Sequence, residues 1–234
     1  MQPGIFTFLR DLSRDLVDFV YPPLCLCCDQ LLEGGEKRVC RRCWSSITPA
    51  TRELTLFLET RSRLLASGSI DELVSLFVFE KEGPFQKIVH ALKYSGMQQV
   101  GRDLGERMGA AAVHLGIDAN MIVPVPLHRR KLRERGYNQA ALIAGGLSEM
   151  TGISVYTDII RRTKWTETQT TLSRDERAEN VKGAFSVDAR STVADSVIVV
   201  DDVITTGATT EAVGSALKAH GAKRIIAMSA AIAE

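Results

Sequence analysis

Four apolar residues at 197–200 lead directly into Asp201 and Asp202, and then into a short loop rich in threonine and glycine. An uninterrupted apolar strand of this kind is typical of a sheet covered by helices, because both faces of the strand are then buried. A segment with helical spacing, 209–220, follows the loop. In sheets of this class, ligands bind beyond the carboxyl ends of the strands. This order of features predicts an α/β domain with a ligand site at the two aspartates.

Short apolar runs alternate with longer amphipathic segments from about residue 73 onward. Strands are predicted at 74–79, 121–125, 155–160, 184–187, 197–200 and 224–228, and helices at 83–94, 100–115, 138–150 and 209–220. This alternation predicts a mainly parallel sheet flanked by helices. The chain has 234 residues, enough for one such domain and a small N-terminal unit. We place the boundary after residue 60, with the N-terminal unit at 1–60 and the α/β domain at 61–234.

The loop after the aspartates has the chemistry of a phosphate site. Thr205, Thr206, Gly207 and Thr209 offer hydroxyls and approachable N–H groups at the start of a helix, whose positive end attracts anions. Two carboxylates beside a phosphate would repel the ligand unless they accept hydrogen bonds from hydroxyls or help to hold a divalent cation. A ribose phosphate meets both demands.

All five cysteines of the chain lie between residues 25 and 43. Four of them form two Cys-x-x-Cys pairs, Cys25 with Cys28 and Cys40 with Cys43, which can close a tetrahedral zinc site of structural type. Cys27 is an alternative ligand within the first pair, and a set of redox-active or merely buried thiols is the other interpretation. Zinc thiolates indicate a reducing compartment.

Apolar residues at helical spacing near the N-terminus predict an amphipathic helix that ends before Pro22. Its polar face is slightly negative, which favours docking on protein over binding to an acidic membrane surface. The longest uncharged apolar run is far shorter than a membrane span, and no secretory signal pattern is present. The net charge of +1 gives no overall attraction to nucleic acid. We expect a cytoplasmic protein without membrane insertion.

Two polar segments follow the predicted strands. Residues 128–135 carry four Arg and one Lys against one Glu, and a basic loop beside a strand end can receive a pyrophosphate with its magnesium. A solvated basic face and a patch for single-stranded DNA are the alternatives, although Tyr137 alone offers a nearby ring for base stacking. The long segment 161–182 has almost no apolar periodicity, which is typical of a lid or of a linker.

The segment VIVVDDVITTGAT resembles the fingerprint of the type I phosphoribosyltransferases. The resemblance implies that Asp201 and Asp202 contact the ribose hydroxyls of phosphoribosyl pyrophosphate, while the following loop holds its 5-phosphate and Mg²⁺ accompanies the pyrophosphate. It also implies a pyrophosphate loop and a flexible loop that closes over the ligand to exclude water. The implied phosphate loop is Thr205, Thr206, Gly207, Ala208 and Thr209; the pyrophosphate loop is Arg135, Gly136, Tyr137 and Asn138; the flexible loop carries Arg162, Lys164, Arg174 and Arg177.

More of the chain is similar to a subgroup, the ComF-type competence proteins, in which Cys-x-x-Cys pairs precede such a domain. The shared motifs are HALKYSG at 90–96, VPVPLHRRKLRERGYNQA at 123–140 and TQTTLSRDERAENVKGAF at 168–185. The resemblance implies phosphoribosyl transfer to an unidentified nitrogen acceptor, a link to DNA uptake and partners in the competence machinery. A catalytically silent ligand sensor or adaptor is the rival interpretation. His90, Lys93 and Tyr94 of the first motif are not assigned to the site.

Overall fold

The computed structural model describes residues 22–163 and 183–234 of the chain. The chain divides into two compact units, Met1–Ser46 and Ile47–Glu234. The predicted boundary after residue 60 therefore differs from the observed one, and it falls inside helix α3 (Thr55–Ala66). The second unit begins earlier because its first residues bond to a sheet strand: Ala50 N donates to Leu76 O at 2.9 Å. The predicted N-terminal helix lies outside the described residues.

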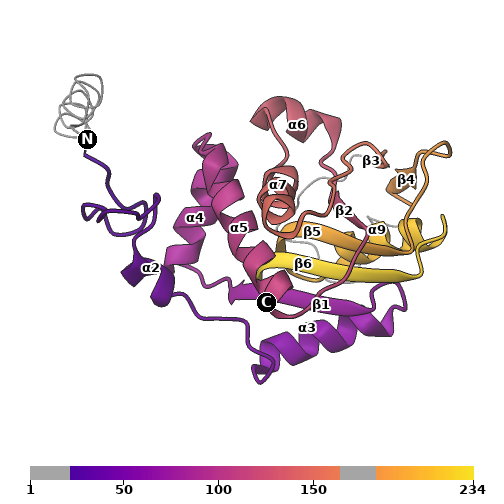
Figure 1. The fold of residues 1–234 in the computed structure, drawn as a ribbon, viewed down its shortest axis with the longest axis horizontal. Helices are drawn as coiled ribbons and strands as arrows, with labels where there is room; N and C mark the ends of the chain where they lie inside the picture. Colours follow the sequence, from indigo (N-terminus) through magenta and orange to yellow (C-terminus); the bar gives the residue numbers. More distant parts are fainter. Residues whose placement is uncertain (1–21, 164–182) are drawn as a thin grey trace, which may run out of the picture. The chain divides into compact units, whose positions relative to one another are not determined.

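The second unit is built on a parallel sheet with the strand order β1-β6-β5-β2 (Figure 1). Its strands are β1 (Glu72–Val78), β2 (Met121–Pro124), β5 (Ser196–Ile204) and β6 (Arg224–Ile232). The predicted strands of this sheet are confirmed, and β5 and β6 run further than their apolar cores suggested. Residues 197–200 of β5 are fully buried, as expected for a central strand between two layers of helices.

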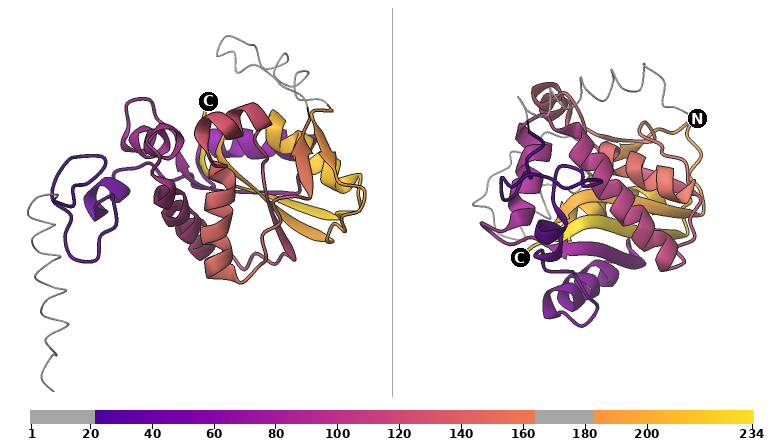
Figure 2. Two further views of the ribbon diagram at one scale, coloured as in Figure 1. Left: turned by 90° about the horizontal axis from the view of Figure 1, so that it is seen from above. Right: turned by 60° about the vertical axis from the view of Figure 1, so that its left-hand side comes forward.

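Helices cover both faces of this sheet (Figures 1 and 2). One core cluster joins α3 and α9 (Ala208–Lys218) to the side chains of Val197 and Val199, while Ile198 and Val200 point to the opposite face. Helices α4 (Pro84–Tyr94), α5 (Gln98–His114) and α7 (Gln139–Thr151) lie on that opposite side. The α/β architecture predicted from the sequence is therefore confirmed.

Helices α5 and α7 pack backbone to backbone. The glycines Gly101, Gly105 and Gly109 recur every four residues and face α7. A Cβ atom on Gly105 would lie 2.0 Å from the carbonyl oxygen of Ile143, and one on Gly146 would lie 2.3 Å from that of Arg102. Only glycine allows this approach, which holds α7 and the loop before it against the sheet.

Two local predictions differ from the structure, and one helix was not predicted. Residues 155–160 form no regular strand: Val155 makes an isolated bridge to Ile122, and strand β3 (Ile160–Arg162) pairs antiparallel with β4 (Phe185–Val187) outside the main sheet. The basic loop is helix α6 (Arg129–Arg135), because His128 Nδ1 accepts from Arg130 N at 3.2 Å and Gly136 ends the helix at φ 82°. Helix α3 was not predicted at all. Within the described ranges, no helix has the length and apolar character needed to cross a bilayer.

Candidate phosphoribosyl and zinc sites

The two aspartates lie within β5 rather than after it. Asp201 is in register with Ser229 of β6, and the strand continues to Ile204. Each carboxylate is held by the next backbone N–H: Asp202 N donates to Asp201 Oδ1, and Val203 N donates to Asp202 Oδ1, both at 2.8 Å. These bonds orient the two acids at the carboxyl end of the sheet, where parallel sheets place ligands.

The predicted phosphate loop connects β5 to helix α9. Gly207 adopts the left-handed conformation, with φ 83°, and caps the helix. Thr206 Oγ1 accepts from Ala208 N at 3.4 Å, and the carbonyl of Thr205 accepts from Arg63 Nη2 at 3.0 Å. The first N–H groups of an 11-residue helix thus point toward the end of the strand that carries the acids. The structure brings together the predicted acids and the predicted loop.

Lys93 is part of this site, although the sequence did not assign it there. Its Nζ lies 2.6 Å from Asp202 Oδ2, and the two side chains are only 24% and 14% exposed. Lys93 comes from the last turn of α4, more than 100 residues away in the chain. The motif HALKYSG was a signal that this helix matters, but no pattern in the sequence indicates which carboxylate the lysine reaches.

Further cations gather near Lys93. Burial, followed by the positive charges of Arg162, Arg135 and Lys93, lowers the pKa of Lys131. Burial also lowers the pKa of Arg162, while the charge of Asp201 acts in the opposite direction. Lys131 and Arg135 belong to α6, and Arg162 belongs to β3. We call Lys93, Lys131, Arg135 and Arg162 the cation cluster; its position beside two carboxylates suits a ligand that carries both phosphates and hydroxyls.

The predicted pyrophosphate loop is held mainly by structural contacts. Arg135 belongs to the cation cluster and lies 5.6 Å from the ring centre of Tyr94. Tyr137 Oη donates to Leu92 O at 2.6 Å. Asn138 Nδ2 donates to Val125 O at 3.0 Å, and its Oδ1 caps α7 by accepting from Ala140 N at 3.1 Å. These contacts tie the segment to β2, α4 and α7. Of the predicted flexible-loop residues, Arg162 is described in β3, while Lys164, Arg174 and Arg177 lie outside the described residues.

The surroundings of Asp201 oppose its ionisation. Burial, and then the charge of Asp202, raises the pKa of Asp201 to about 7, and the charge of Lys93 offsets only part of this rise. Loss of the Asp201 proton places a second negative charge beside Asp202 in a largely buried site, where like charges repel strongly. A ligand that supplies hydroxyl hydrogens or a cation would relieve the repulsion.

A cleft of about 940 Å³ opens beside the acids. It shares Lys93 and Thr205 with the site, and Val203 of β5 forms part of its wall. Its remaining lining combines apolar and polar side chains, among them Leu56, Val78, Phe79, Gln86, His90 and Tyr94. A ligand in this cleft would therefore lie next to whatever the acids hold.

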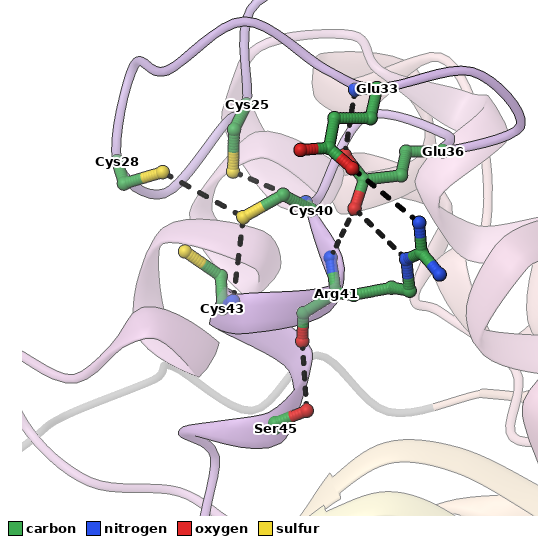
Figure 3. Close-up of polar contacts among 8 residues, drawn as sticks. All are labelled: Cys25, Cys28, Glu33, Glu36, Cys40, Arg41, Cys43 and Ser45. Atoms are coloured by element: carbon green, nitrogen blue, oxygen red, sulfur yellow. Dashed lines mark hydrogen bonds and ion pairs between the residues drawn. The ribbon is translucent and has the colours of Figure 1, made fainter.

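The cysteines of the first unit form a compact cluster (Figure 3). The sulfur atoms of Cys25, Cys28, Cys40 and Cys43 lie within 4.8 Å of one another, and Cys27 is not one of the group. Cys28 Sγ and Cys40 Sγ are 3.8 Å apart. Zn–S bonds of about 2.3 Å in a tetrahedron put the sulfurs about 3.8 Å apart. The predicted ligand set fits a structural zinc ion.

Backbone N–H groups point at the sulfurs in this cluster. Cys40 N and Cys27 N donate to Cys25 Sγ at 3.3 and 3.4 Å. Burial raises the pKa of Cys25, but these hydrogen bonds outweigh it and lower that pKa to about 6. Burial, and then the neighbouring thiol of Cys28, raises the pKa of Cys43 well above its usual value. Ionisation of the Cys43 thiol beside the other sulfurs is therefore unfavourable without a cation, and zinc supplies one.

A carboxylate clamps the loop between the two cysteine pairs (Figure 3). Glu36 Oε1 accepts from Arg41 N at 2.7 Å, and its Oε2 accepts from Glu33 N at 2.9 Å. These backbone bonds lower the pKa of Glu36. The clamp fixes the loop just before α2 (Arg41–Ser45), the helix that presents Cys43.

Comparison with known proteins agrees with both parts of the structure. Residues 136–232 match the Phosphoribosyl transferase domain family, and residues 16–54 match the Double zinc ribbon domain family. Competence protein F of Haemophilus influenzae is 41% identical over 106 residues, 44% of this chain and 46% of that protein. DNA utilization protein YhgH of Escherichia coli K12 is 29% identical over 147 residues, 61% of this chain and 64% of that protein. The matched region thus spans less than two thirds of either relative.

Solved structures with some likeness include glutamine phosphoribosylpyrophosphate amidotransferase from B. subtilis, with a TM-score of 0.38 and 18% identity over 55% of this chain and 25% of that one. A hypoxanthine phosphoribosyltransferase from Staphylococcus aureus has a TM-score of 0.36 and 13% identity over 56% of this chain and 62% of that one. These scores are too low to support a conclusion.

The two family matches are the stronger findings. The zinc ribbon match contains the cysteine cluster, and the phosphoribosyl transferase match, further along the chain, contains the strand with Asp201 and Asp202. Competence protein F and YhgH are similar to this chain in sequence, with 41% and 29% identity over the matched residues. The order of the two matches, a zinc ribbon ahead of a phosphoribosyl transferase domain, and the similarity to Competence protein F support the resemblance to the ComF-type competence proteins.

Proposed function

We propose that the second unit binds phosphoribosyl pyrophosphate with Mg²⁺ and transfers the phosphoribosyl group to a nitrogen acceptor. The observation that carries this proposal is the meeting of three features at one sheet edge: two carboxylates, the positive end of α9 and the cation cluster. Asp201 and Asp202 would accept hydrogen bonds from the ribose hydroxyls. The loop from Thr205 to Thr209 would bind the 5-phosphate through N–H and hydroxyl groups.

The donor set fits a pyrophosphate that arrives with magnesium. Mg²⁺ prefers oxygen ligands and usually binds through one or two carboxylates together with phosphate oxygens. Asp201 and Asp202 would hold the ion, directly or through water, on the ribose side. Bound there, Mg²⁺ would neutralise charge that builds up on the departing pyrophosphate. Lys131 and Arg135 would do the same from α6.

The chemistry needs positioning and charge stabilisation rather than a protein nucleophile. The lone pair of the acceptor nitrogen forms a bond to the anomeric carbon, the bond from that carbon to the pyrophosphate oxygen breaks, and the nitrogen releases its proton to solvent. The cleft beside Lys93 would hold the acceptor next to the sugar. The proposed cover that excludes water is the segment 161–182; Arg162 lies in β3, and residues 164–182 of this segment lie outside the described residues.

The names of two relatives support a cellular setting for the proposed activity. Competence protein F and DNA utilization protein YhgH are the curated relatives, so we propose a link to DNA uptake or use, with proteins of the competence machinery as partners. The thiolate cluster supports a cytoplasmic location, where thiols stay reduced. Single-stranded DNA is a weaker candidate partner. Tyr137 is the aromatic residue near the basic helix that could stack on a base, and its hydroxyl group already donates a hydrogen bond to Leu92 O.

Calorimetry with phosphoribosyl pyrophosphate and Mg²⁺ tests the binding step. The variant carrying both Asp201→Asn and Asp202→Asn should lose binding while remaining folded, because it removes two charges that repel each other. Asp195→Asn is the matched control, since Asp195 is an exposed acid that pairs with Lys223. Absence of binding by the folded wild-type protein would refute the proposal.

A panel of bases and amines tests the transfer step. Pyrophosphate release that requires one acceptor and disappears in the double aspartate variant would support the enzyme. Tight binding without release for any acceptor, together with a ligand-dependent protein partner, would instead support the sensor or adaptor.

A further inference from the structure

The second oxygen of Asp202 is already occupied by a positive charge of the protein itself. Asp202 Oδ1 accepts from Val203 N at 2.8 Å, and Asp202 Oδ2 lies 2.6 Å from Lys93 Nζ. Both side chains are largely buried, so water screens this ion pair less than a surface pair. A ribose hydroxyl or a metal ion approaching Asp202 must therefore compete with the ammonium group.

Lys93 is also positioned to leave. It extends from the last turn of α4, and its positive charge is one of those that lower the pKa of Lys131. Arg135 and Arg162 belong to the same cluster. A polyanion placed among these cations would give the ammonium group a second partner close to the first. Lys93 thus neutralises Asp202 in the ligand-free protein and also belongs to the cation cluster, which suits a phosphate group.

We propose that Lys93 is an internal counter-ion that the ligand displaces, and that its ammonium group passes from Asp202 to the pyrophosphate when the sugar phosphate binds. This inference rests on the proposed function and adds a residue that the family resemblance did not assign. In the ligand-free protein, Lys93 keeps the acidic pair from collecting a divalent cation. In the complex, the same group stabilises the pyrophosphate.

The exchange also links the two halves of the site. Lys93 lines the cleft of about 940 Å³ as well as contacting Asp202. When the ammonium group moves, the wall of the cleft changes next to Val203 and Thr205. The acceptor would therefore meet its completed pocket only after the sugar phosphate is bound, which gives an ordered reaction and protects the activated sugar from early attack.

Two binding measurements on Lys93→Met test the exchange because they should move in opposite directions. Electron paramagnetic resonance with Mn²⁺ alone should show roughly fivefold tighter metal binding than in the wild type. Calorimetry with phosphoribosyl pyrophosphate and Mg²⁺ should show about tenfold weaker binding. Lys93→Arg keeps the charge and should stay within about twofold of the wild type in both measurements.

Lys87→Met is the matched control, since it removes an ammonium group from an exposed position of the same helix. It should change neither measurement. If Lys93→Met weakens both Mn²⁺ and sugar phosphate, or changes neither, Lys93 only supports the fold or is inert, and the inference is overturned. Tighter binding of both would show that Lys93 only blocks the site, which also overturns it. If the wild type binds Mn²⁺ but no sugar phosphate, the proposed function itself fails, and this inference with it.

Discussion

The glycine at the start of α9 gives the sharpest test of how the phosphate loop is built. Gly207 has φ 83°, and a Cβ atom added to it would lie 2.5 Å from Leu64 Cδ2. Leu64 is fully buried and has little room to move away. In Gly207→Ala, the left-handed conformation costs about 1 kcal/mol, and overpacking against the core adds about 1–3 kcal/mol. We expect a loss of about 2–4 kcal/mol in the free energy of unfolding.

Urea unfolding followed by circular dichroism measures this loss. Gly152→Ala is the matched control, because Gly152 also has a left-handed φ, 74°, but nothing lies within 4 Å of its added Cβ. The control should lose only about 1 kcal/mol. The same Gly207→Ala variant should bind phosphoribosyl pyrophosphate more weakly, since relief of the clash shifts the loop at the helix start.

Comparing Gly207→Ala with Gly152→Ala shows whether the contact with Leu64 restricts the phosphate loop. Adding Leu64→Val to Gly207→Ala should recover part of the loss, because the smaller side chain makes room for the new methyl group. If Gly207→Ala costs no more than Gly152→Ala, the contact with Leu64 does not restrict the loop, and the explanation of its geometry is wrong.

Three further outcomes are expected. Metal analysis should find one zinc ion per chain, and Cys43→Ser should remove it and make residues 22–46 sensitive to protease; full zinc content in Cys43→Ser would contradict the assigned ligand set. Binding of phosphoribosyl pyrophosphate with Mg²⁺ should strengthen as the pH rises through about 7, because Asp201 has a raised pKa and must lose its proton to accept a hydroxyl; a flat profile in calorimetry would contradict this, and Asp201→Asn should flatten it. Gly105→Ala should cost about 3 kcal/mol or more in urea unfolding, because its Cβ would meet a backbone oxygen, whereas Gly145→Ala in the open part of α7 should be neutral or stabilising.

Local spacing was enough to predict several parts of this protein. Two Cys-x-x-Cys pairs predict four sulfurs around one metal because each pair brings its sulfurs together within a few residues, and the cluster of Cys25, Cys28, Cys40 and Cys43 has that geometry. The main parallel strands were predictable because a strand that is buried on both faces contains a nearly continuous run of apolar residues. The roles of Thr205 to Thr209 in binding phosphate stay a prediction.

Other parts depend on which segments meet in space. Helix α3 was not predicted because its apolar residues contact the sheet without forming a clear stripe along one helix face. Helix α6 was predicted as a loop because its residues are mostly charged. The sequence did not indicate why α5 contains glycines, because the reason is the close packing of α7 against them.

The sequence by itself determined the zinc ligands, the α/β class and the strand that carries Asp201 and Asp202, because each follows from the order and spacing of neighbouring residues. Only the tertiary structure decided that Lys93 of α4 binds Asp202 and that Arg162 and Lys131 stand near it. These charges come from separate elements, and the distance between them depends on how the helices pack on the sheet. Electrostatic energy depends on that distance and on burial, and neither quantity is written in the local pattern of residues.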